Sequence, residues 1–279
     1  MCLIVVAWQA HPEFPLVLAA NRDEFFARPT AAADFWPDAP AILAGRDLAA
    51  GGTWLGLAHA EDRSGATQWR LAALTNYRDP AQQRPDARSR GELTTAFLRA
   101  DLGAFEHAAA LSQDSWQYGG FNLLTATLGR EGAGELAYCH NLAEVLGQQA
   151  PASPQRLAPG IHALSNSVLD TPWPKLQQAR QQFAEALRLL PDSDAFNTAA
   201  LALLADRQRA ADADLPNTGV SLAWERVLSS IFVAAPDYGT RASTLLWIDR
   251  QGQASLLEVS FGPGGEEQQR RHFLLPPQP

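Results

Sequence analysis

The residue best placed for chemistry is Cys2, which directly follows Met1. A residue as small as cysteine at this position normally permits removal of the initiator methionine, so we expect Cys2 to become the first residue. It would then carry a thiol with a reference pKa of about 8.5 and an α-amine with a reference pKa of about 7.7 to 8. A nucleophile and a base would coexist near neutral pH, as nucleophilic catalysis requires. The alternative is a small buried residue that starts the first strand.

A polar tetrad, Asn21-Arg22-Asp23-Glu24, ends the apolar segment Pro15 to Ala20. A carboxylate in this place can accept a hydrogen bond from an N-terminal ammonium or orient a thiol, and Arg22 can lower the pKa of a neighbouring thiol. Arg22 and Asp23 are adjacent, so they point to opposite faces of the sheet if the strand continues through them. The alternative is a charged turn with an internal ion pair.

Two further polar stretches end apolar segments in the same way, Thr75 to Asp79 and Ser165 to Ser167. The amides of Asn76 and Asn166 can donate hydrogen bonds to a developing oxyanion, where a preorganised donor contributes most. The alternative is turn chemistry, since asparagine tolerates left-handed geometry and caps helices. Polar clusters at several strand ends together favour a site.

The elements that must position these residues occur in alternating blocks of strands and helices. Helices are expected after Ser89, where Ser89 and Glu92 have the spacing of a capping box, after Pro174, and from Ala195 to Ala205. Apolar or alternating segments predict the strands: Cys2 to Trp8, Pro15 to Ala20, Thr53 to Ala58, Trp69 to Thr75, Phe121 to Thr127, Leu136 to His140, Ile161 to Leu164, Arg226 to Val233, Ala242 to Ile248 and Ala254 to Phe261.

Blocks of this kind suit a layered α+β domain with antiparallel sheets better than alternating βαβ units. We find no repeat and no clear linker in the sequence, so we predict one domain over residues 1–279. Its last segment, Gly262 to Pro279, is rich in proline, glycine and glutamine, and we expect it to be peripheral, on the surface or frayed.

Composition excludes several classes of protein. The hydrophobic content of 46% suffices for a core, and no apolar segment approaches the ~20 residues that a membrane-spanning helix needs, so we expect no stable membrane insertion. The formal charge of −8 argues against nucleic acid as a partner. A basic region followed by a long apolar one is missing at the amino terminus, so we expect no secretory signal and a cytoplasmic location.

Cysteine and histidine usage argues against a disulfide scaffold and a metal centre. Cys2 and Cys139 are the only cysteines and are best interpreted as thiols. The histidines lack His-x-x-x-His or paired-cysteine spacing, so we expect no metal site. These are His11, His59, His107, His140, His162 and His272.

Taken together, several motifs of the chain resemble the NRDE family, the group that contains the transport and Golgi organisation protein and its bacterial relatives. The resemblance runs from Met1 to about Ile248. It rests on Met1-Cys2, Asn21-Arg22-Asp23-Glu24, Gly51-Gly52-Thr53-Trp54-Leu55-Gly56, Thr75-Asn76-Tyr77-Arg78, Leu164-Ser165-Asn166-Ser167 and Thr171-Pro172-Trp173-Pro174-Lys175.

This resemblance implies an N-terminal-nucleophile (Ntn) hydrolase fold, a four-layer αββα sandwich with two packed antiparallel sheets. By similarity to choloylglycine and penicillin V acylases, Cys2 would be the nucleophile, its α-amine the base, and Asp23 the group that orients the amine. Asn76 would donate to the oxyanion, Asn166 would position the substrate carbonyl, and Arg241, in Gly239-Thr240-Arg241-Ala242-Ser243-Thr244, would lie near the thiol.

Two functions follow from the resemblance. The first is an amidohydrolase that cleaves C–N amide bonds through a thioester at Cys2, with no cofactor required. The second is a non-enzymatic carrier that uses the same pocket for haem or an acyl-coenzyme A. We leave the oligomeric state open. The residues expected to bind the ligand are Asn21, Arg22, Glu24, Trp54, Tyr77 and Arg78.

The carrier hypothesis adds residues whose chemistry suits acidic, flat or apolar ligands. Arginine can pair with propionates or phosphates, and tryptophan can flank an apolar ligand. The sequence has no Cys-x-x-Cys-His motif for covalent haem attachment. The further candidates are Arg88, Arg90, Trp8 and Trp173.

Overall fold

The computed structural model describes residues 2–61, 63, 65–82, 84, 86–111, 113–142 and 154–277, which divide into two compact units. Unit 1 comprises the chain up to Ala27, Arg78–Ala81 and Pro159–Pro276. Unit 2 comprises Arg28–Tyr77, the described part of Gln82–Ala158 and Pro277. Met1, whose removal we expect, and residues 278 and 279 of the predicted peripheral tail lie outside the described residues.

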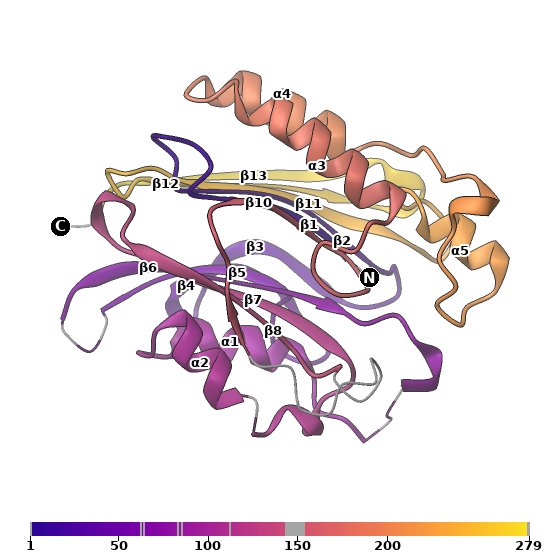
Figure 1. The fold of residues 1–279 in the computed structure, drawn as a ribbon, viewed down its shortest axis with the longest axis horizontal. Helices are drawn as coiled ribbons and strands as arrows, with labels where there is room; N and C mark the ends of the chain where they lie inside the picture. Colours follow the sequence, from indigo (N-terminus) through magenta and orange to yellow (C-terminus); the bar gives the residue numbers. More distant parts are fainter. Residues whose placement is uncertain are drawn as a thin grey trace. The chain divides into compact units, whose positions relative to one another are not determined.

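Unit 1 is built on an antiparallel sheet with the strand order β10-β1-β2-β11-β12-β13 (Figure 1). β1 therefore lies between β2 and β10, and β2 lies between β1 and β11. The edge strand β13 contains residues of the predicted tail and is largely exposed. The strands are β1 (Cys2–Trp8), β2 (Leu16–Phe25), β10 (Gly160–Leu164), β11 (Tyr238–Ile248), β12 (Ala254–Phe261) and β13 (Glu267–Leu275).

Helices α3 (Pro174–Leu187) and α4 (Ser193–Leu204) cover one face of this sheet (Figure 1). α3 begins with proline at its first turn, where the missing N–H costs no hydrogen bond. α4 is capped by Asp192, whose side chain accepts a hydrogen bond from the N–H of Ala195 at 3.0 Å. Both helices bury apolar side chains against odd-numbered residues of β1. The shared core includes Leu3, Val5, Phe183 and Phe196.

Because side chains alternate along a strand, Cys2 points to the face of β1 opposite to Leu3 and Val5. The segment that predicts this strand is buried along its whole length. The helix-covered face therefore fixes the position of β1 by apolar packing, while the opposite face carries the thiol.

Asn21 ties β2 to two distant segments of unit 1. Its side chain is fully buried, and its amide nitrogen donates to the carbonyl oxygens of Leu204 (2.8 Å) and Ile231 (2.9 Å). Its amide oxygen accepts a hydrogen bond from the hydroxyl of Ser243 at 2.6 Å. The first residue of the polar tetrad thus connects β2 to the end of α4, to the segment after helix α5 (Leu222–Leu228) and to β11.

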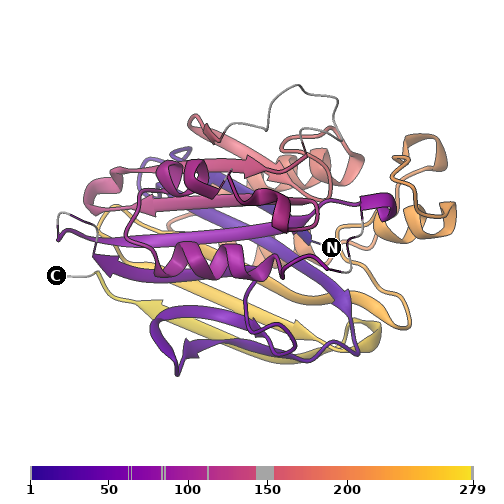
Figure 2. The same cartoon turned by 90° about the horizontal axis from the view of Figure 1, so that it is seen from below.

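Unit 2 is built on a second antiparallel sheet, in the order β3-β4-β5-β6-β7-β8-β9. Helices α1 (Gly91–Arg99) and α2 (Ala104–Leu111) pack on it, as Figure 2 shows from below. The strands are β3 (Thr30–Trp36), β4 (Ala39–Asp47), β5 (Leu55–Glu61), β6 (Thr67–Asn76), β7 (Phe121–Leu128), β8 (Gly134–His140) and β9 (Gln155–Arg156). Every strand pair among the described residues is antiparallel, so the predicted α+β class with two antiparallel sheets is confirmed.

The glycine pair of the Gly51-to-Gly56 motif has a steric cause. Gly51 has a φ of 78°, a conformation that favours glycine. A Cβ on Gly52 would lie 2.6 Å from the carbonyl carbon of Gly91, at the start of α1. Glycine at position 52 therefore allows the backbone of this motif to lie close against the backbone at the start of α1, within unit 2.

Two sequence predictions about local structure are wrong. Residues 226–233 form no strand in the structure: α5 (Leu222–Leu228) begins instead, because the Ser221 hydroxyl accepts a hydrogen bond from the N–H of Trp224. The capping box is not formed at α1 either. The Glu92 carboxylate accepts hydrogen bonds from the guanidinium of Arg88 and leaves the helix start without a side-chain cap.

None of the helices among the described residues combines the length and the apolar character that crossing a lipid bilayer demands.

We predict that Asn21→Ala destabilises the fold strongly. The substitution leaves two buried carbonyl oxygens and one buried hydroxyl without their partner, which costs roughly 2 to 4 kcal/mol of unfolding free energy. Urea denaturation measures this difference. Asn217→Ala, at an exposed turn, serves as the control and should change the free energy by less than about 0.5 kcal/mol. Equal, small effects of both substitutions would contradict the anchoring role of Asn21.

Candidate functional site

Cys2 is held by hydrogen bonds at the start of β1. It pairs with Arg22 of β2, and its carbonyl oxygen accepts a hydrogen bond from the hydroxyl of Ser165 at 2.9 Å. The thiol is free and buried, with 7% of the residue exposed. Burial raises the pKa of this thiol, while the nearby Arg22 lowers it. At neutral pH the thiol is therefore protonated, and a protonated thiol becomes a nucleophile only when a base removes its proton.

Asp23 is a buried carboxyl group on the helix-covered side of β2. It accepts a hydrogen bond from the hydroxyl of Thr240 at 2.7 Å, and this hydroxyl in turn accepts one from the N–H of Val233 at 2.9 Å. Burial raises the pKa of Asp23, and the charges of Lys175 and Arg78 lower it. A carboxyl group held in this way can orient an ammonium group.

Arg22 points to the other face, because β2 continues through Phe25. Its guanidinium lies 3.8 Å from the carboxylate of Glu24, so these two residues of the tetrad share one side. The tetrad therefore separates into two pairs: Asn21 and Asp23 face the helices, and Arg22 and Glu24 face away from them.

Arg241 occupies a β-bulge between Thr240 and Ala242, where the register of β11 against β2 shifts. Its guanidinium donates to the carbonyl oxygen of Phe25 at 2.9 Å and lies over the ring of Phe26. These contacts place Arg241 at the end of β2 beside the tetrad.

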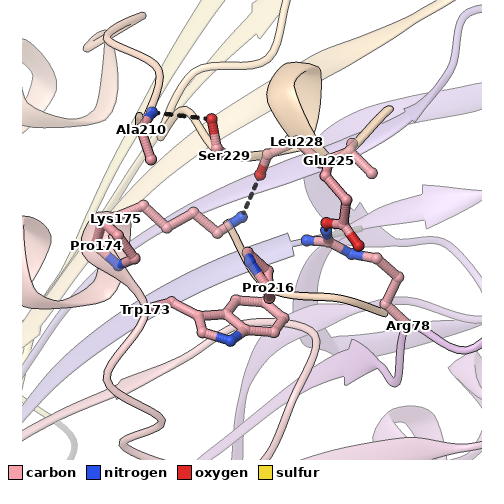
Figure 3. A pocket seen from close by; sticks show the side chains of 9 residues that line it. All are labelled: Arg78, Trp173, Pro174, Lys175, Ala210, Pro216, Glu225, Leu228 and Ser229. Carbon is pink, nitrogen blue, oxygen red and sulfur yellow. Dashed lines mark hydrogen bonds and ion pairs between the residues drawn. The ribbon is translucent and has the colours of Figure 1, made fainter. Parts of the chain in front are cut away.

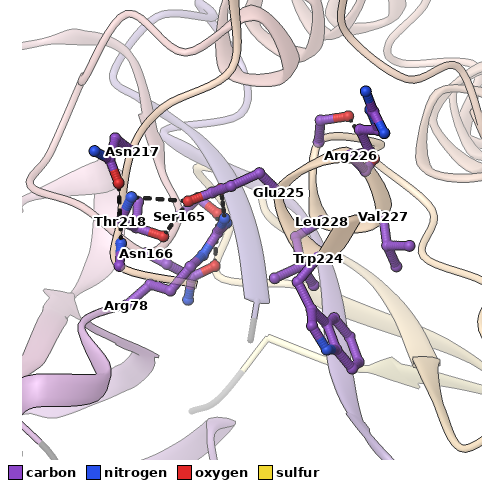
Figure 4. A network of polar contacts seen from close by, with 12 residues as sticks. Arg78, Ser165, Asn166, Asn217, Thr218, Trp224, Glu225, Arg226, Val227 and Leu228 are labelled. Atoms are coloured by element: carbon purple, nitrogen blue, oxygen red, sulfur yellow. Dashed lines mark hydrogen bonds and ion pairs between the residues drawn. The ribbon is translucent and has the colours of Figure 1, made fainter. Parts of the chain in front are cut away.

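Asn166 and Arg78 meet in unit 1, although they are far apart in the sequence. The N–H of Arg78 donates to the carbonyl oxygen of Asn166 at 2.9 Å, and the Asn166 amide oxygen accepts from the hydroxyl of Ser165 at 3.1 Å (Figure 4). The same hydroxyl lies 2.9 Å from the Cys2 carbonyl oxygen, and its single hydrogen is shared between these two acceptors. A continuous set of contacts therefore links Cys2 to Arg78.

The Arg78 guanidinium forms a buried ion pair with Glu225 of α5. The distance between nitrogen and oxygen is 2.7 Å, and each side chain is 4% exposed. The second carboxylate oxygen of Glu225 accepts hydrogen bonds from the N–H (2.8 Å) and the hydroxyl (2.6 Å) of Thr218 (Figure 4). Burial lowers the pKa of Arg78, and Glu225 raises it. The Arg78 guanidinium, the Glu225 carboxylate, and the N–H and hydroxyl of Thr218 together form a preorganised polar network.

Lys175 brings a second cation to this region. Its ammonium group donates to the carbonyl oxygen of Leu228 at 3.0 Å and lies 6.0 Å from the centre of the Trp173 ring (Figure 3). The Arg78 guanidinium lies 5.0 Å from the centre of the same ring. Burial, with the charge of Arg78, lowers the pKa of Lys175 to about 7, although Asp23, Cys2 and Glu225 act in the opposite direction.

A small pocket lies beside these cations. Its free volume of about 10 Å³ is close to what a single water molecule needs. Figure 3 shows the Lys175 ammonium and the Arg78 guanidinium directed toward one another over the ring of Trp173. The pocket is lined by Arg78, Trp173, Pro174, Lys175, Ala210, Pro216, Glu225, Leu228 and Ser229.

The remaining predicted site residues belong to unit 2. Asn76 ends β6, where it pairs with Phe121 of β7, and its side chain is half-buried. Tyr77 donates its N–H to the carbonyl oxygen of Gly120 at 2.9 Å. Trp54 precedes β5 and is also half-buried. Their assignment to catalysis or ligand binding stays a prediction.

The additional arginines and Trp8 of the carrier hypothesis have other surroundings. Arg88 is exposed and pairs with Glu92, and Arg90 donates to the carbonyl oxygen of Gly120 at 3.1 Å. Trp8 is the last residue of β1, at the other end of the strand from Cys2, and is buried. Among the described residues, no three histidine, cysteine or acidic side chains form a group that could hold a metal ion.

Sequence analysis gave no role to Lys175, Glu225 and Thr240, which the structure places around Asp23 and Arg78. One signal was available for Lys175, since it is the only lysine in the chain and follows Trp173-Pro174 in a quoted motif. Glu225 gave no such signal, because it lies outside every predicted element, just before the predicted strand Arg226 to Val233, and its partner Arg78 lies 147 positions away.

The fold and site define an α+β protein with a buried cysteine at the start of a strand in an antiparallel sheet. The chain belongs to the family described as Transport and Golgi organisation 2, which it matches over residues 1–263. It is 37% identical to the Transport and Golgi organization protein 2 homolog of Bos taurus and 35% identical to that of Homo sapiens, and each alignment covers 94% of this chain and 93% of the relative. The Transport and Golgi organization protein 2 of Drosophila melanogaster is 27% identical, with 95% of each chain covered.

Among solved structures, the chain is similar to Anbu from Hyphomicrobium sp. strain MC1, with 10% identity and a TM-score of 0.36, over 98% of this chain and 88% of Anbu. This likeness is too weak to support an argument.

We predict that Lys175→Met stabilises the protein most at low pH. Because the folded pKa of Lys175 is about 7, below its usual 10.5, the unfolded chain binds an extra proton between these values. The penalty for burying the charged amine is complete below pH 7 and is relieved as the pH rises toward 10.5. The advantage of the variant should therefore shrink by a few kcal/mol over this range.

Urea denaturation of both proteins between pH 6 and pH 10 measures this change. The hydrogen bond to Leu228 is lost at every pH and shifts the curve without changing its slope. Arg180→Met, at an exposed position of α3, provides the control. A stability difference that does not vary with pH would contradict the lowered pKa.

Proposed function

We propose that this protein is an N-terminal-cysteine amidohydrolase that cleaves linear C–N amide bonds with Cys2 as its nucleophile. The observation that carries the proposal is the buried thiol at the start of β1, whose backbone is fixed by Arg22 and Ser165 and whose surroundings include the buried carboxyl of Asp23. A packed strand holds the reacting atom more precisely than a loop does. Once Met1 is removed, the α-amine of Cys2 becomes the base that the thiol needs.

The reaction would proceed through a thioester. The α-amine takes the thiol proton, and the sulfur attacks the amide carbonyl carbon to form a tetrahedral oxyanion. Collapse of the oxyanion breaks the C–N bond, and the departing amine takes the proton from the α-ammonium. Water then attacks the thioester with the α-amine as base, which releases a carboxylic acid and restores the thiol.

The other predicted residues have supporting roles in this proposal. Asp23, held by Thr240, orients the α-amine. Asn166 positions the substrate carbonyl, and Asn76 donates to the oxyanion. Arg241 lies beside the tetrad and contributes positive charge near the thiol.

The alternative is a carrier that binds haem or an acyl-coenzyme A without cleaving it. The observation that favours it is the pair of buried cations, Arg78 and Lys175, beside the Trp173 ring, since such groups suit propionates or phosphates. The volume of their pocket is far below that of a haem-sized ligand, so a carrier would have to open it.

We also propose a cytoplasmic location. Both cysteines are free thiols buried in the structure, as is usual in a reducing compartment.

The hydrolase proposal predicts that Cys2→Ser lowers the turnover of acyl amides by roughly 100-fold or more, because it replaces the nucleophile. The measurement combines hydrolysis of a panel of acyl amides and acyl-coenzyme A esters with the intact mass of the protein. We expect loss of Met1 and an acyl adduct of Cys2 in the native protein. Cys139→Ser, which alters a buried thiol of unit 2, is the control and should retain turnover.

Unchanged hydrolysis in the Cys2→Ser variant would rule out the enzyme. Retained Met1, or an inert Cys2 in a protein that binds intact haem or acyl-coenzyme A, would favour the carrier. A carrier should keep its ligand after Cys2→Ser.

A further inference from the structure

The Lys175 ammonium is a buried cation that lacks a counter-ion in unit 1. Its residue is 5% exposed, and among the described residues no carboxylate lies within ion-pair distance of it. An ammonium group has three N–H donors, and the carbonyl oxygen of Leu228 takes one. Burying a charge without a partner is costly, so an anion that reached this group would bind with a large electrostatic gain.

The carboxyl groups near Lys175 are occupied by other partners. Glu225 pairs with Arg78 through one oxygen and accepts two hydrogen bonds from Thr218 through the other. Asp23 accepts from Thr240, and in the proposed mechanism it also orients the Cys2 amine. The negative charge of Glu225 balances the positive charge of Arg78, and the charge of Asp23 balances that of the Cys2 amine. The positive charge of Lys175 is then left without a carboxylate to balance it.

Arg78 supplies a second free donor beside the same pocket. Its Nε atom is buried and has no hydrogen-bond partner in the described structure, while another nitrogen of the same guanidinium is fixed by Glu225. The side chain is 4% exposed. An unpaired buried N–H of this kind costs free energy unless a ligand or water accepts its hydrogen.

Helix α3 adds to the positive potential. Its first residues, Pro174 and Lys175, line the pocket together with Trp173. The N-terminal end of a helix carries a partial positive charge that favours anions. The pocket therefore offers an ammonium, a guanidinium N–H and a helix terminus in one small space. Because its free volume is close to that of a single water molecule, the pocket has to widen to admit a carboxylate, as it does for the ligand of a carrier.

We propose that Lys175 and Arg78 bind a carboxylate group of the ligand, so that the natural amide substrate carries a carboxylate close to the bond that is cleaved. A monoanion balances the single unpaired positive charge. A phosphate dianion would leave excess negative charge next to Glu225, and a neutral amide would leave Lys175 without a counter-ion. The binding site stands without the proposed function, whereas the identity of its ligand as a substrate depends on it.

Several charged groups face Lys175 and set the pH at which it binds an anion. Arg78 disfavours its protonated form, and Asp23, Glu225 and Cys2 favour it. With a pKa of about 7, Lys175 gains or loses its proton near physiological pH in the empty protein. Carboxylate binding should therefore be accompanied by proton uptake, and its affinity should fall about tenfold per pH unit above the pKa.

The single lysine makes the test direct. The full chain labelled with ¹³C at lysine gives one side-chain Cε signal, whose titration by NMR reports the Lys175 pKa alone. We expect saturating acetate to raise the titration midpoint from about 7 by about one pH unit or more. Acetamide, the neutral isostere, should leave it unchanged. Chloride keeps the ionic strength constant in every sample.

Two substitutions in α3 test whether Lys175 is the residue that binds acetate. Calorimetry should show that Lys175→Met loses acetate binding at least about tenfold, whereas Arg180→Met, on the exposed side of α3, retains it. Melting curves establish that both variants are folded. A midpoint that acetate does not move, an equal effect of acetamide, preferred binding of inorganic phosphate, or binding that survives Lys175→Met would each overturn the carboxylate site.

Amide hydrolysis by the native protein separates this proposal from the hydrolase proposal. Acetate binding without any amide hydrolysis by the native protein would support the site and reject the enzyme. If the native protein cleaves amides with and without a neighbouring carboxylate at equal kcat/KM, the enzyme stands and the substrate assignment is overturned. A preference of at least tenfold in kcat/KM for carboxylate-bearing amides, lost in Lys175→Met, would support both.

Discussion

The antiparallel pairing of β1 with β2 on one side and β10 on the other is the constraint on which the site depends. This pairing places Cys2 opposite Arg22 and brings Ser165, at the end of β10, against the Cys2 carbonyl oxygen. It also sets which side chains face the helices, because alternate residues of a strand point to opposite faces. The pairing of Cys2 with Arg22 and its contact with Ser165 both follow from this register.

Burial then gives the polar groups of unit 1 their chemical character. The pKa of Asp23 is raised and that of Lys175 is lowered chiefly by removal from water. Burial also lowers the pKa of Arg78, and its ion pair with Glu225 opposes that shift. Arg78 and Glu225 form a structural ion pair because their buried charges balance each other. Lys175 has no carboxylate at ion-pair distance among the described residues, and it is therefore the group that we propose to bind a ligand.

Sequence reasoning found the elements whose patterns are local and strong. The apolar segment after Cys2 and the periodic face of α3 predicted their strand and helix, because burial on a sheet or on one helix face leaves a regular pattern. The segment 226–233 was misread, since its buried residues after α5 look like a strand while Ser221 starts a helix. Apolar character alone does not distinguish the two.

Within the candidate site, residues in recognisable strand-end motifs were found and their long-range partners were not. Cys2, Asp23 and Asn166 stand out by type and position. Glu225 and Thr240 owe their roles to contacts that cross 147 and 217 positions. No local pattern encodes a contact of that range, which is why the buried network became visible only in three dimensions.

The way Cys2 is held also separates the folding of this protein from its maturation. The anchoring contacts described above use the Cys2 carbonyl oxygen and the strand that follows it. In the proposed mechanism the α-amine of Cys2 is the base, so an amino-terminal affinity tag would mask the group that this mechanism needs. Such a preparation would be silent in the tests of the hydrolase proposal, so tags belong at the carboxyl terminus.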